Sequence, residues 1–416
     1  MPNKVIDFLT KTDTYKYSMG QLYLHRHPNA RARWDFKCRT KGVDLSGLCD
    51  PINAELDHLC TLHYTEWELD GIRRVMPWLA NDFIEYLEDF QLKRKYIHCE
   101  KSADEPCGLK IWAEGPQIQV FWFEIYVLQI VQHLYFSGRQ IDWEASDAEL
   151  DAVIAKWKAA DDRGIKFTVS DFGIRRSVSD AWNEHMVKTM LERLPGIFVG
   201  TSNVYLAIRL NCKAIGTFAH ELYAVYQGID TIPLRKSQAM VLEDWTKEYR
   251  GDLGIALSDN FGFNAFLQDF DKYFAKLFDG CRHDSGNPFT WGEMMIAHYR
   301  KLGIDPATKI GCWSDSLDAD KAIAIAEHFN MRIKVAFGIG TFLCAGLLRF
   351  STEAPKPLSM VMKVTRVKEC ETAPWTWAVK LSDSIGKTMC PDELHVEYVK
   401  KVFDYRSIDE VQETCQ

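Results

Sequence analysis

The 416-residue sequence lacks several features that would point to a protein class at once. It has no C-x-x-C pair and no cysteine–histidine cluster with zinc spacing, so a structural metal site is not expected. It has no basic excess, and its net charge of −8 argues against a nucleic-acid-binding protein. It also has no internal repeat. The twelve scattered cysteines are typical of reduced, buried residues in a cytosolic protein.

Long apolar runs are also missing. Lys4 and Asp7 interrupt any apolar start, so no secretory signal is expected. The most apolar segment, 118–136, contains Glu124 and His133 and predicts a buried helix, because a membrane span needs about 20 mostly apolar residues. We therefore expect a cytoplasmic protein without a membrane partner.

What the sequence does contain is a regular alternation of strand and helix signals from about residue 165. Each short β-branched or aromatic run is followed by glycine, hydroxyl or acidic residues and then by a helical pattern. Strands are predicted over 166–169, 197–199, 214–215, 254–257, 309–313 and 332–337, and helices over 186–194, 263–277, 291–302 and 319–329. About seven such units closing on themselves predict an α/β protein with a TIM-like β/α barrel.

The two ends of the chain follow another pattern. Helices are predicted near 12–19, 52–62 and 76–90, the first with a threonine or Asp13 as its cap. Strands are predicted over 31–37, 110–113, 358–367 and 376–381, with 114–116 as a turn. A chain of this length can bury one large core, or one large and one small domain. We expect an N-terminal α+β domain over 1–115, a β/α barrel over 116–350, and a C-terminal segment, 351–416, that returns to the N-terminal domain.

Polar side chains gather at the carboxyl ends of the predicted strands, where β/α barrels carry their active sites. Two successive strands end in glycine and a hydroxyl residue, Gly200-Thr201 and Gly216-Thr217. Such ends place backbone N–H groups around a phosphate. His220 follows the second end. An isolated histidine is more often structural, but this position beside Glu221 favours a nucleophile or general base.

Other strand ends offer further contacts for anions. Arg175 and Arg176 lie at a helix start, where cations are disfavoured unless an anion lies between them. The run 282–286, Arg-His-Asp-Ser-Gly, is either a polar turn or a contact to a phosphate or a Mg²⁺-phosphate. Ser314-Asp315 either caps the next helix or contacts a phosphate. The run 338–341, Gly-Ile-Gly-Thr, is weak as a dinucleotide signature but suits a phosphate nest.

Eight stretches, in order along almost the whole chain, closely resemble nicotinate phosphoribosyltransferases. They are TDTYKYSMGQ (12–21), SDFGIRRSVS (170–179), FVGTSNVYLA (198–207), IGTFAHE (215–221), LGIALSDNF (253–261), RHDSGNP (282–288), WSDSLD (313–318) and FGIGTFL (337–343). KLSDSIGKT (380–388) extends the similarity toward the C-terminus. The resemblance implies a type II phosphoribosyltransferase: an irregular β/α barrel with a second α+β domain, working as a homodimer with shared active sites.

The resemblance also implies the reaction. Nicotinate and phosphoribosyl pyrophosphate would give nicotinate mononucleotide and pyrophosphate in NAD salvage. ATP hydrolysis would be coupled through a phosphohistidine at His220, with Mg²⁺ assisting. Arg282, Asp284 and Ser285 would face the ribose and pyrophosphate. The implied phosphate and ribose contacts also include Thr201, Ser314, Asp315, Gly338, Gly340 and Thr341.

For nicotinate, the resemblance implies stacking between Phe172 and Tyr15 of the neighbouring subunit. The similar nicotinamide phosphoribosyltransferases have an aspartate where this chain has Ser202. A carboxylate there accepts from a carboxamide and repels a carboxylate, so Ser202 with Arg175 near suits nicotinate. The alternatives are a nicotinamide- or quinolinate-type transferase, disfavoured by Ser202 and His220, and a catalytically silent ligand-binding relative, which would be expected to lack His220 or Asp284.

Overall fold

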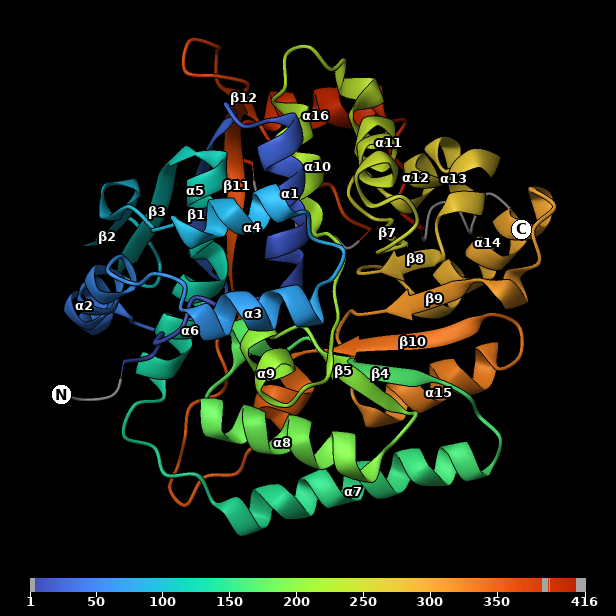
Figure 1. Ribbon diagram of the computed structural model, residues 1–416, viewed down its shortest axis with the longest axis horizontal. Coiled ribbons are helices and arrows are strands. Elements are labelled where there is room, and N and C mark those ends of the chain that lie inside the picture. The colour runs from blue at the N-terminus through green and yellow to red at the C-terminus, as the bar shows by residue number, and fades with distance from the viewer. Residues whose placement is uncertain (1–3, 384–387, 389, 409–416) are drawn as a thin grey trace. The chain divides into compact units, whose positions relative to one another are not determined.

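The computed structural model describes residues 4–383, 388 and 390–408 (Figure 1). The chain divides into two compact units, each made of three separate segments. Unit 1 comprises Met1–Lys156, Ser170–Gly216 and Ile339–Lys363, and unit 2 comprises Trp157–Val169, Thr217–Gly338 and Val364–Gln416. The domain boundaries expected from the sequence, after residues 115 and 350, stay a prediction. Residues 384–387 of the KLSDSIGKT stretch lie outside the described part of the chain.

The strands belong to two sheets. One has the order β12-β11-β1-β3-β2, and the other has the order β6-β5-β4-β10-β9-β8-β7. The first sheet contains β1 (Arg31–Cys38), β2 (Ile97–Lys101), β3 (Leu109–Pro116), β11 (Met360–Lys368) and β12 (Thr376–Trp377). The second contains β4 (Thr168–Asp171), β5 (Phe198–Thr201), β6 (Lys213–Ala214), β7 (Ile255–Leu257), β8 (Gly280–His283), β9 (Ile310–Trp313) and β10 (Lys334–Ile339).

Helices connect these strands. They are α1 (Thr14–Arg26), α2 (Cys49–Leu59), α3 (Glu66–Val75), α4 (Asn81–Glu88), α5 (Gln117–Val120), α6 (Phe123–Tyr135), α7 (Trp143–Asp162), α8 (Asp180–Arg193), α9 (Val204–Arg209), α10 (His220–Gln227), α11 (Ser237–Tyr249), α12 (Phe263–Asp269), α13 (Lys272–Leu277), α14 (Pro288–Lys301), α15 (Ala319–Phe329) and α16 (Glu393–Val402). Short turns of helix are η1 (Ser46–Leu48), η2 (Arg94–Tyr96), η3 (Ile174–Arg176), η4 (Leu234–Lys236), η5 (Pro306–Thr308) and η6 (Phe342–Gly346).

The register of the parallel strands in unit 2 sets the position of their polar ends. Leu257 of β7 lies opposite Arg282 of β8, and His283 lies opposite Trp313 of β9. Because parallel neighbours in register end at the same edge, the residues that follow them come together there. This edge therefore collects Asp259 and Ser314 with the residues at the end of β8.

The C-terminal segment of unit 2 packs onto the loop and helix that follow β7. Phe261 stacks on Phe403 with ring centroids 3.7 Å apart, and Val379 and Leu381 are buried in the same hydrophobic cluster. The Leu381 N–H also donates to the carbonyl oxygen of Asn260 at 2.9 Å. Lys380, between two buried apolar neighbours, is thereby fixed near the end of β7.

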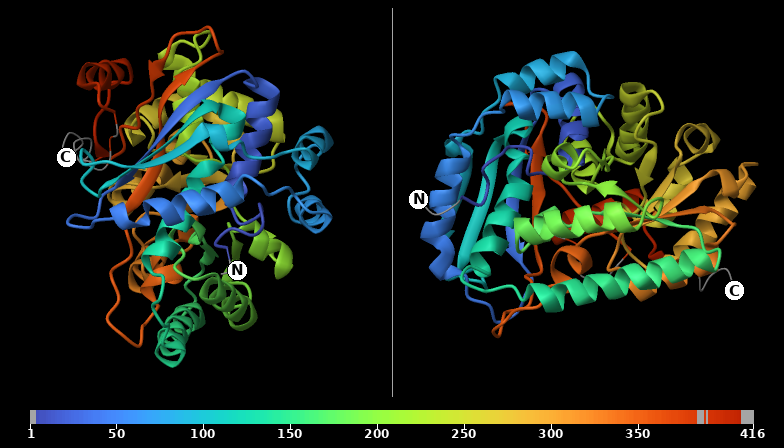
Figure 2. Two further views of the ribbon diagram at one scale, coloured as in Figure 1. Left: turned by 90° about the vertical axis from the view of Figure 1, so that its left-hand side faces the viewer. Right: turned by 60° about the horizontal axis from the view of Figure 1, so that its bottom comes forward.

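In unit 1, β3 is the centre of an antiparallel trio, with β1 and β2 on its two sides. Helix α2 packs against β2 and α6, and two further views show this layering (Figure 2). Helix α6 is buried along most of its length, which confirms the helix predicted for the most apolar segment. Within the described residues, no helix has the length and apolar character needed to cross a bilayer. A cytoplasmic location stays a prediction.

Two local predictions were wrong, and one helix with a clear capping signal was missed. The helix expected over 263–277 is two helices, because Asp271 accepts from the backbone N–H groups of Tyr273 and Phe274 and starts α13 anew. The turn expected at 114–116 is part of β3, with Gly115 paired to Ala32. Helix α3 was missed, although Thr65 and Glu68 form its capping box.

The start of α1 also differs from the prediction. Asp13 is at the N-cap position, but its side chain makes no capping hydrogen bond. It accepts instead from the Ser202 hydroxyl, which lies far along the chain. The Asp13 side chain, which the local pattern marks as a helix cap, therefore makes a tertiary contact instead.

A close backbone approach between β8 and β9 gives a stability test. A Cβ on Gly280 would lie 2.0 Å from the carbonyl oxygen of Ile310, which cannot move without breaking the sheet. Gly280→Ala should lower the free energy of unfolding by about 2 kcal/mol or more. Gly47→Ala, where a Cβ meets nothing within 4 Å, is the control and should change it by less than about 0.5 kcal/mol. Equal midpoints of urea unfolding for the two variants would contradict the close approach.

Candidate active site

Several of the predicted site residues lie in two clusters of polar side chains, one in each unit. In unit 2 we define the histidine cluster as His220, Asp259, Arg282, Asp284 and Lys380. In unit 1 we define the Ser202 cluster as Asp13, Asp171, Arg175, Thr201 and Ser202. Each group lies within its own unit.

His220 is the first residue of α10, and two hydrogen bonds attach its surroundings to β7. The Tyr223 hydroxyl donates to the carbonyl oxygen of Leu257, and the Thr217 hydroxyl donates to that of Ile255, both at 2.8 Å. The imidazole is thus held against the residues that follow β7. Its Nε2 lies 2.6 Å from Asp259 Oδ1, and its Nδ1 lies 3.7 Å from Asp284 Oδ2.

Asp259 is almost fully buried and has partners on both oxygens. Besides His220, the Ser285 hydroxyl donates to its Oδ2 at 2.5 Å, and Lys380 Nζ lies 3.2 Å from the same oxygen. Burial alone would raise the pKa of Asp259, but His220, Lys380 and Ser285 together hold it well below its usual range. Asp259 is therefore ionised at neutral pH.

The pKa of the imidazole is also lowered, and for a histidine this favours the neutral form. Burial is the largest cause, and it lowers the pKa of His220 to about 4 despite the neighbouring carboxylates. A neutral imidazole carries one proton, and the short contact with the Asp259 carboxylate places that proton on Nε2. Nδ1 then keeps its lone pair, which is what a nitrogen nucleophile requires.

Asp284 completes the group. Arg282 Nη1 lies 3.5 Å from its Oδ1, Lys380 Nζ lies 4.0 Å from its Oδ2, and the Ser314 hydroxyl donates to its Oδ1 at 2.7 Å. Burial would raise the pKa of Asp284, but Arg282, His220 and Lys380 outweigh it and lower the pKa. The cluster therefore holds two carboxylates and two cations around one neutral imidazole.

His220, Asp259 and Asp284 could in principle be metal ligands, because each offers one atom within 4.8 Å of the others. However, the 2.6 Å separation of Nε2 and Oδ1 is a hydrogen bond, and Lys380 already supplies a cation between the carboxylates. Mg²⁺ prefers about six oxygen ligands in octahedral geometry. These residues therefore do not fit a resident Mg²⁺ ion.

In the Ser202 cluster, hydroxyl groups bind buried carboxylates. Thr201 Oγ1 donates to Asp171 Oδ2 at 2.7 Å, and the Gly173 N–H donates to Asp171 Oδ1 at 2.9 Å. The Ser202 hydroxyl donates to Asp13 Oδ1. In this structure the hydroxyl protons of Thr201 and Ser202 are therefore donated within the protein.

Asp13 and Arg175 determine the charge of this cluster. Burial, opposed by Ser202 and Arg175, raises the pKa of Asp13 to about 6. Burial likewise raises the pKa of Asp171 to about 6. The Arg175 side chain is 43% exposed, and its Nη1 lies 3.8 Å from Glu124 Oε1. Arg175 is therefore a cation of this cluster that a ligand can reach.

The remaining predicted residues lie around these groups. Tyr15 is in the first turn of α1, where the Lys16 ammonium lies 5.4 Å from its ring centroid. Phe172 follows β4, and a Cβ on Gly340 would lie 2.8 Å from the Phe172 carbonyl oxygen, so glycine permits this close approach. Thr341 is exposed beside it.

Asp315 and Gly338 lie in unit 2, on neighbouring strand ends. Phe337 of β10 is opposite Trp313 of β9, so Gly338 continues the register beside Ser314. Asp315 follows Ser314, and its carboxylate accepts from the Ser316 hydroxyl at 3.1 Å. The structure shows no direct contact between these two residues and His220.

Four residues of the clusters were not among the site residues predicted from the sequence. Asp171 and Asp259 carry the signal that identified the others, an acidic residue at a strand end. Asp13 has only a helix-cap signal. Lys380 is the first residue of the KLSDSIGKT stretch in the C-terminal segment, but no strand-end pattern marks it.

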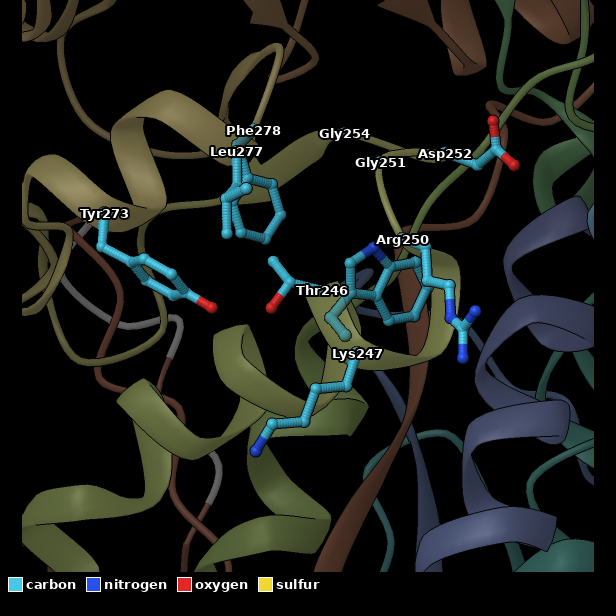
Figure 3. Close-up of a pocket in the computed structure, with 10 residues that line it drawn as sticks. Thr246, Lys247, Arg250, Gly251, Asp252, Gly254, Tyr273, Leu277 and Phe278 are labelled. Carbon is cyan, nitrogen blue, oxygen red and sulfur yellow. The ribbon is translucent and has the colours of Figure 1, made fainter.

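A pocket of about 220 Å³ in unit 2 lies elsewhere. Figure 3 shows Thr246, Tyr273 and Leu277 around it, and its lining also includes Gly254 and Phe278. These two residues precede β7 and β8, so the pocket is at the amino ends of the strands. The histidine cluster is at their carboxyl ends, where β/α proteins carry their chemistry.

Comparisons with known proteins agree over nearly the whole chain. Residues 167–407 match the Nicotinate phosphoribosyltransferase (NAPRTase) family, and residues 10–132 match the N-terminal domain of that family. Nicotinate phosphoribosyltransferases of Acinetobacter baumannii and Chromobacterium violaceum are each 43% identical to this chain. The alignments cover 98% and 96% of this chain and 99% and 97% of those proteins, respectively.

Solved structures agree as well. The crystal structure of nicotinate phosphoribosyltransferase from Vibrio cholerae has a TM-score of 0.90 and 32% identity, covering 99% of this chain and 97% of that one. The one from Porphyromonas gingivalis has a TM-score of 0.88 and 28% identity, covering 96% and 100%. The predicted fold class, an irregular β/α barrel with a second α+β domain, is confirmed. The chain belongs to the nicotinate phosphoribosyltransferase family.

Proposed function

We propose that this enzyme transfers phosphoribose from phosphoribosyl pyrophosphate to nicotinate, and that ATP hydrolysis is coupled to this step through a phosphohistidine at His220. The products would be nicotinate mononucleotide and pyrophosphate, which serve NAD salvage. Membership of the family supports the transferase reaction. The observation that carries the coupling is the neutral His220, with Nε2 bound to Asp259 and Nδ1 left unprotonated.

In the phosphorylation step, Nδ1 attacks the γ-phosphorus of ATP. The Nδ1–P bond forms as the bond from the γ-phosphorus to the bridging oxygen breaks, and ADP leaves with the electron pair. The positive charge that develops on the ring is stabilised through Nε2–H by the Asp259 carboxylate. His220 is the first residue of α10, and the positive end of the helix dipole favours a phosphoryl group there. Water later hydrolyses the phosphohistidine to free phosphate.

In the transfer step, the bond from the ribose anomeric carbon to pyrophosphate breaks, and the nicotinate ring nitrogen bonds to that carbon. The developing oxocarbenium-like centre needs little acid catalysis, whereas the leaving pyrophosphate needs cations. Arg282 is positioned for this role by its contacts with Asp284, Ser314 and the carbonyl oxygen of Phe218. Mg²⁺ would enter with the phosphates of ATP and phosphoribosyl pyrophosphate, as part of the substrates.

For nicotinate, we propose that Arg175 pairs with the carboxylate and that Phe172 stacks on the ring. Tyr15 from the neighbouring subunit of a homodimer would cover the other face. Ser202 acts mainly by being uncharged and by binding Asp13, because its one proton is already donated there. The nicotinate would thus lie near the cation of Arg175, and the uncharged residue 202 would add no negative charge.

The first test concerns the coupling. His220→Ala should abolish incorporation of labelled γ-phosphate and remove the acceleration of mononucleotide formation by ATP. His185→Ala, a half-exposed histidine bound to Asp147, is the control and should keep both. The measurements are acid-labile protein phosphate and product formation with and without ATP. An equal response to ATP in both variants would show that His220 is structural.

A second test concerns the tautomer. Asp259→Asn turns an acceptor into a group that can donate to Nε2, which would force the proton onto Nδ1. The rate of His220 phosphorylation should fall on the order of 10²-fold or more, because the nucleophilic lone pair is lost. Single-turnover labelling measures it. Unchanged labelling in a folded Asp259→Asn protein would contradict the assignment of Nδ1 as the nucleophile.

A third test concerns substrate choice. Ser202→Asp would place a second carboxylate against Asp13 and beside the nicotinate carboxylate. Its kcat/KM for nicotinate should fall about tenfold further than that of Ser202→Asn, the uncharged control of equal size, and its preference for nicotinamide should rise. Steady-state kinetics with both substrates measure this. Full nicotinate activity in Ser202→Asp would rule out a charge-based choice.

A further inference from the structure

Lys380 is a nearly buried cation that reaches into the histidine cluster from outside the β/α units. Its side chain is 12% exposed, and its Nζ lies 3.2 Å from Asp259 Oδ2 and 4.0 Å from Asp284 Oδ2. These two carboxylates flank the two nitrogens of His220. The ammonium therefore lies near both anions that face the imidazole.

The charge balance at His220 depends on this position. Asp259 comes from the end of β7, and Asp284 and Arg282 come from the end of β8. Arg282 pairs with Asp284 at 3.5 Å. The partner of Asp259 is Lys380, whose ammonium lies 3.2 Å away. Without Lys380, the two carboxylates that face the two ring nitrogens would stabilise the imidazolium form, with a proton on each nitrogen, more strongly than they do in its presence. A doubly protonated ring has no lone pair with which to attack a phosphate.

We propose that Lys380 is a positioning residue that keeps His220 a neutral nucleophile by balancing the charges of Asp259 and Asp284. This inference rests on the phosphohistidine function proposed above and assigns a role to a residue outside the β/α units. Lys380 acts through the imidazole and makes no bond to the reacting atoms.

The backbone around Lys380 is built to hold this position. Val379 and Leu381 are buried with Phe261 and Phe403, and the Leu381 N–H donates to the Asn260 carbonyl oxygen. Three residues after Lys380, the Asp383 N–H donates at 3.0 Å to the Ser285 hydroxyl, and that hydroxyl donates to Asp259. The segment is therefore tied on both sides of Lys380 to the strand ends that carry the cluster.

The electrostatics agree with the geometry. Burial is the main cause that lowers the pKa of His220 to about 4, Asp259 opposes it, and the Lys380 charge lowers the pKa further. Lys380 also helps to lower the pKa of both carboxylates. Its removal should raise the pKa of His220 and leave a larger fraction of the ring protonated near neutral pH.

The experiment compares Lys380→Met, which keeps most of the length without the charge, with Lys380→Arg, which keeps the charge. The rate of His220 phosphorylation by ATP is measured from about pH 3 to 8.5, a range that includes the wild-type pKa of about 4. The His220 ring is titrated over the same range by NMR of labelled histidine, with the signal assigned through His220→Ala. In Lys380→Met, the acidic limb of the rate profile and the NMR midpoint should both move up by about one pH unit or more. In Lys380→Arg, both should stay near the wild-type values.

Other outcomes are equally informative. If Lys380→Met loses phosphorylation by the same factor at every pH while His220 titrates as in wild type, Lys380 contacts phosphate or only supports the fold, and the proposal is overturned. If wild type itself is not phosphorylated, the phosphohistidine function fails, while the NMR midpoints still decide whether Lys380 controls the imidazole. If Lys380→Met does not fold, Lys380→Gln is measured in the same way and by the same criteria.

Discussion

The short hydrogen bond between His220 and Asp259 is the interaction on which the proposed phosphohistidine chemistry depends. It fixes the ring orientation, places the proton on Nε2 and leaves Nδ1 for chemistry. It can form because β7 and β8 are parallel and in register, so that both carboxylates end at one edge of the sheet with α10 beginning beside them. A slip of one residue in either strand would turn the polar side chains to the other face.

A buried carboxylate is costly unless its charge is paired and its oxygens are hydrogen-bonded. In unit 2, Asp259 and Asp284 satisfy this condition with Arg282, Lys380 and two serine hydroxyls. In unit 1, Asp171 is paired with hydroxyl and backbone donors only, and its pKa rises to about 6. The two units thus place buried carboxylates at strand ends with different results. In unit 2, cations keep Asp259 and Asp284 ionised. In unit 1, Asp171 has no such cation among the described residues and holds its proton more tightly.

The hydroxyl residues at the strand ends have a different use from the one their sequence pattern suggests. Glycine–hydroxyl ends are typical of phosphate sites, yet Thr201, Ser202 and Ser285 all donate to carboxylates of the protein. In this structure they orient Asp171, Asp13 and Asp259, and the phosphate contacts expected of Thr201 and Ser285 stay predictions. Arg282 and the part-exposed Arg175 are the cations nearest these groups.

The β/α succession and most of the strand ends at the two clusters could be predicted from local sequence patterns. Each strand is a short apolar run followed by a polar stop, and that signal is local in the chain. The local pattern was therefore enough to assign His220, Arg282, Asp284 and Ser314 to one edge of the sheet. Interactions between distant residues could not be read in this way. Asp13 had the signal of a helix cap but binds Ser202. Lys380 had no strand-end signal, because its position depends on Val379 and Leu381 packing against Phe261 and Phe403. These contacts form only in the folded chain, since burial and charge pairing join segments that no local pattern connects.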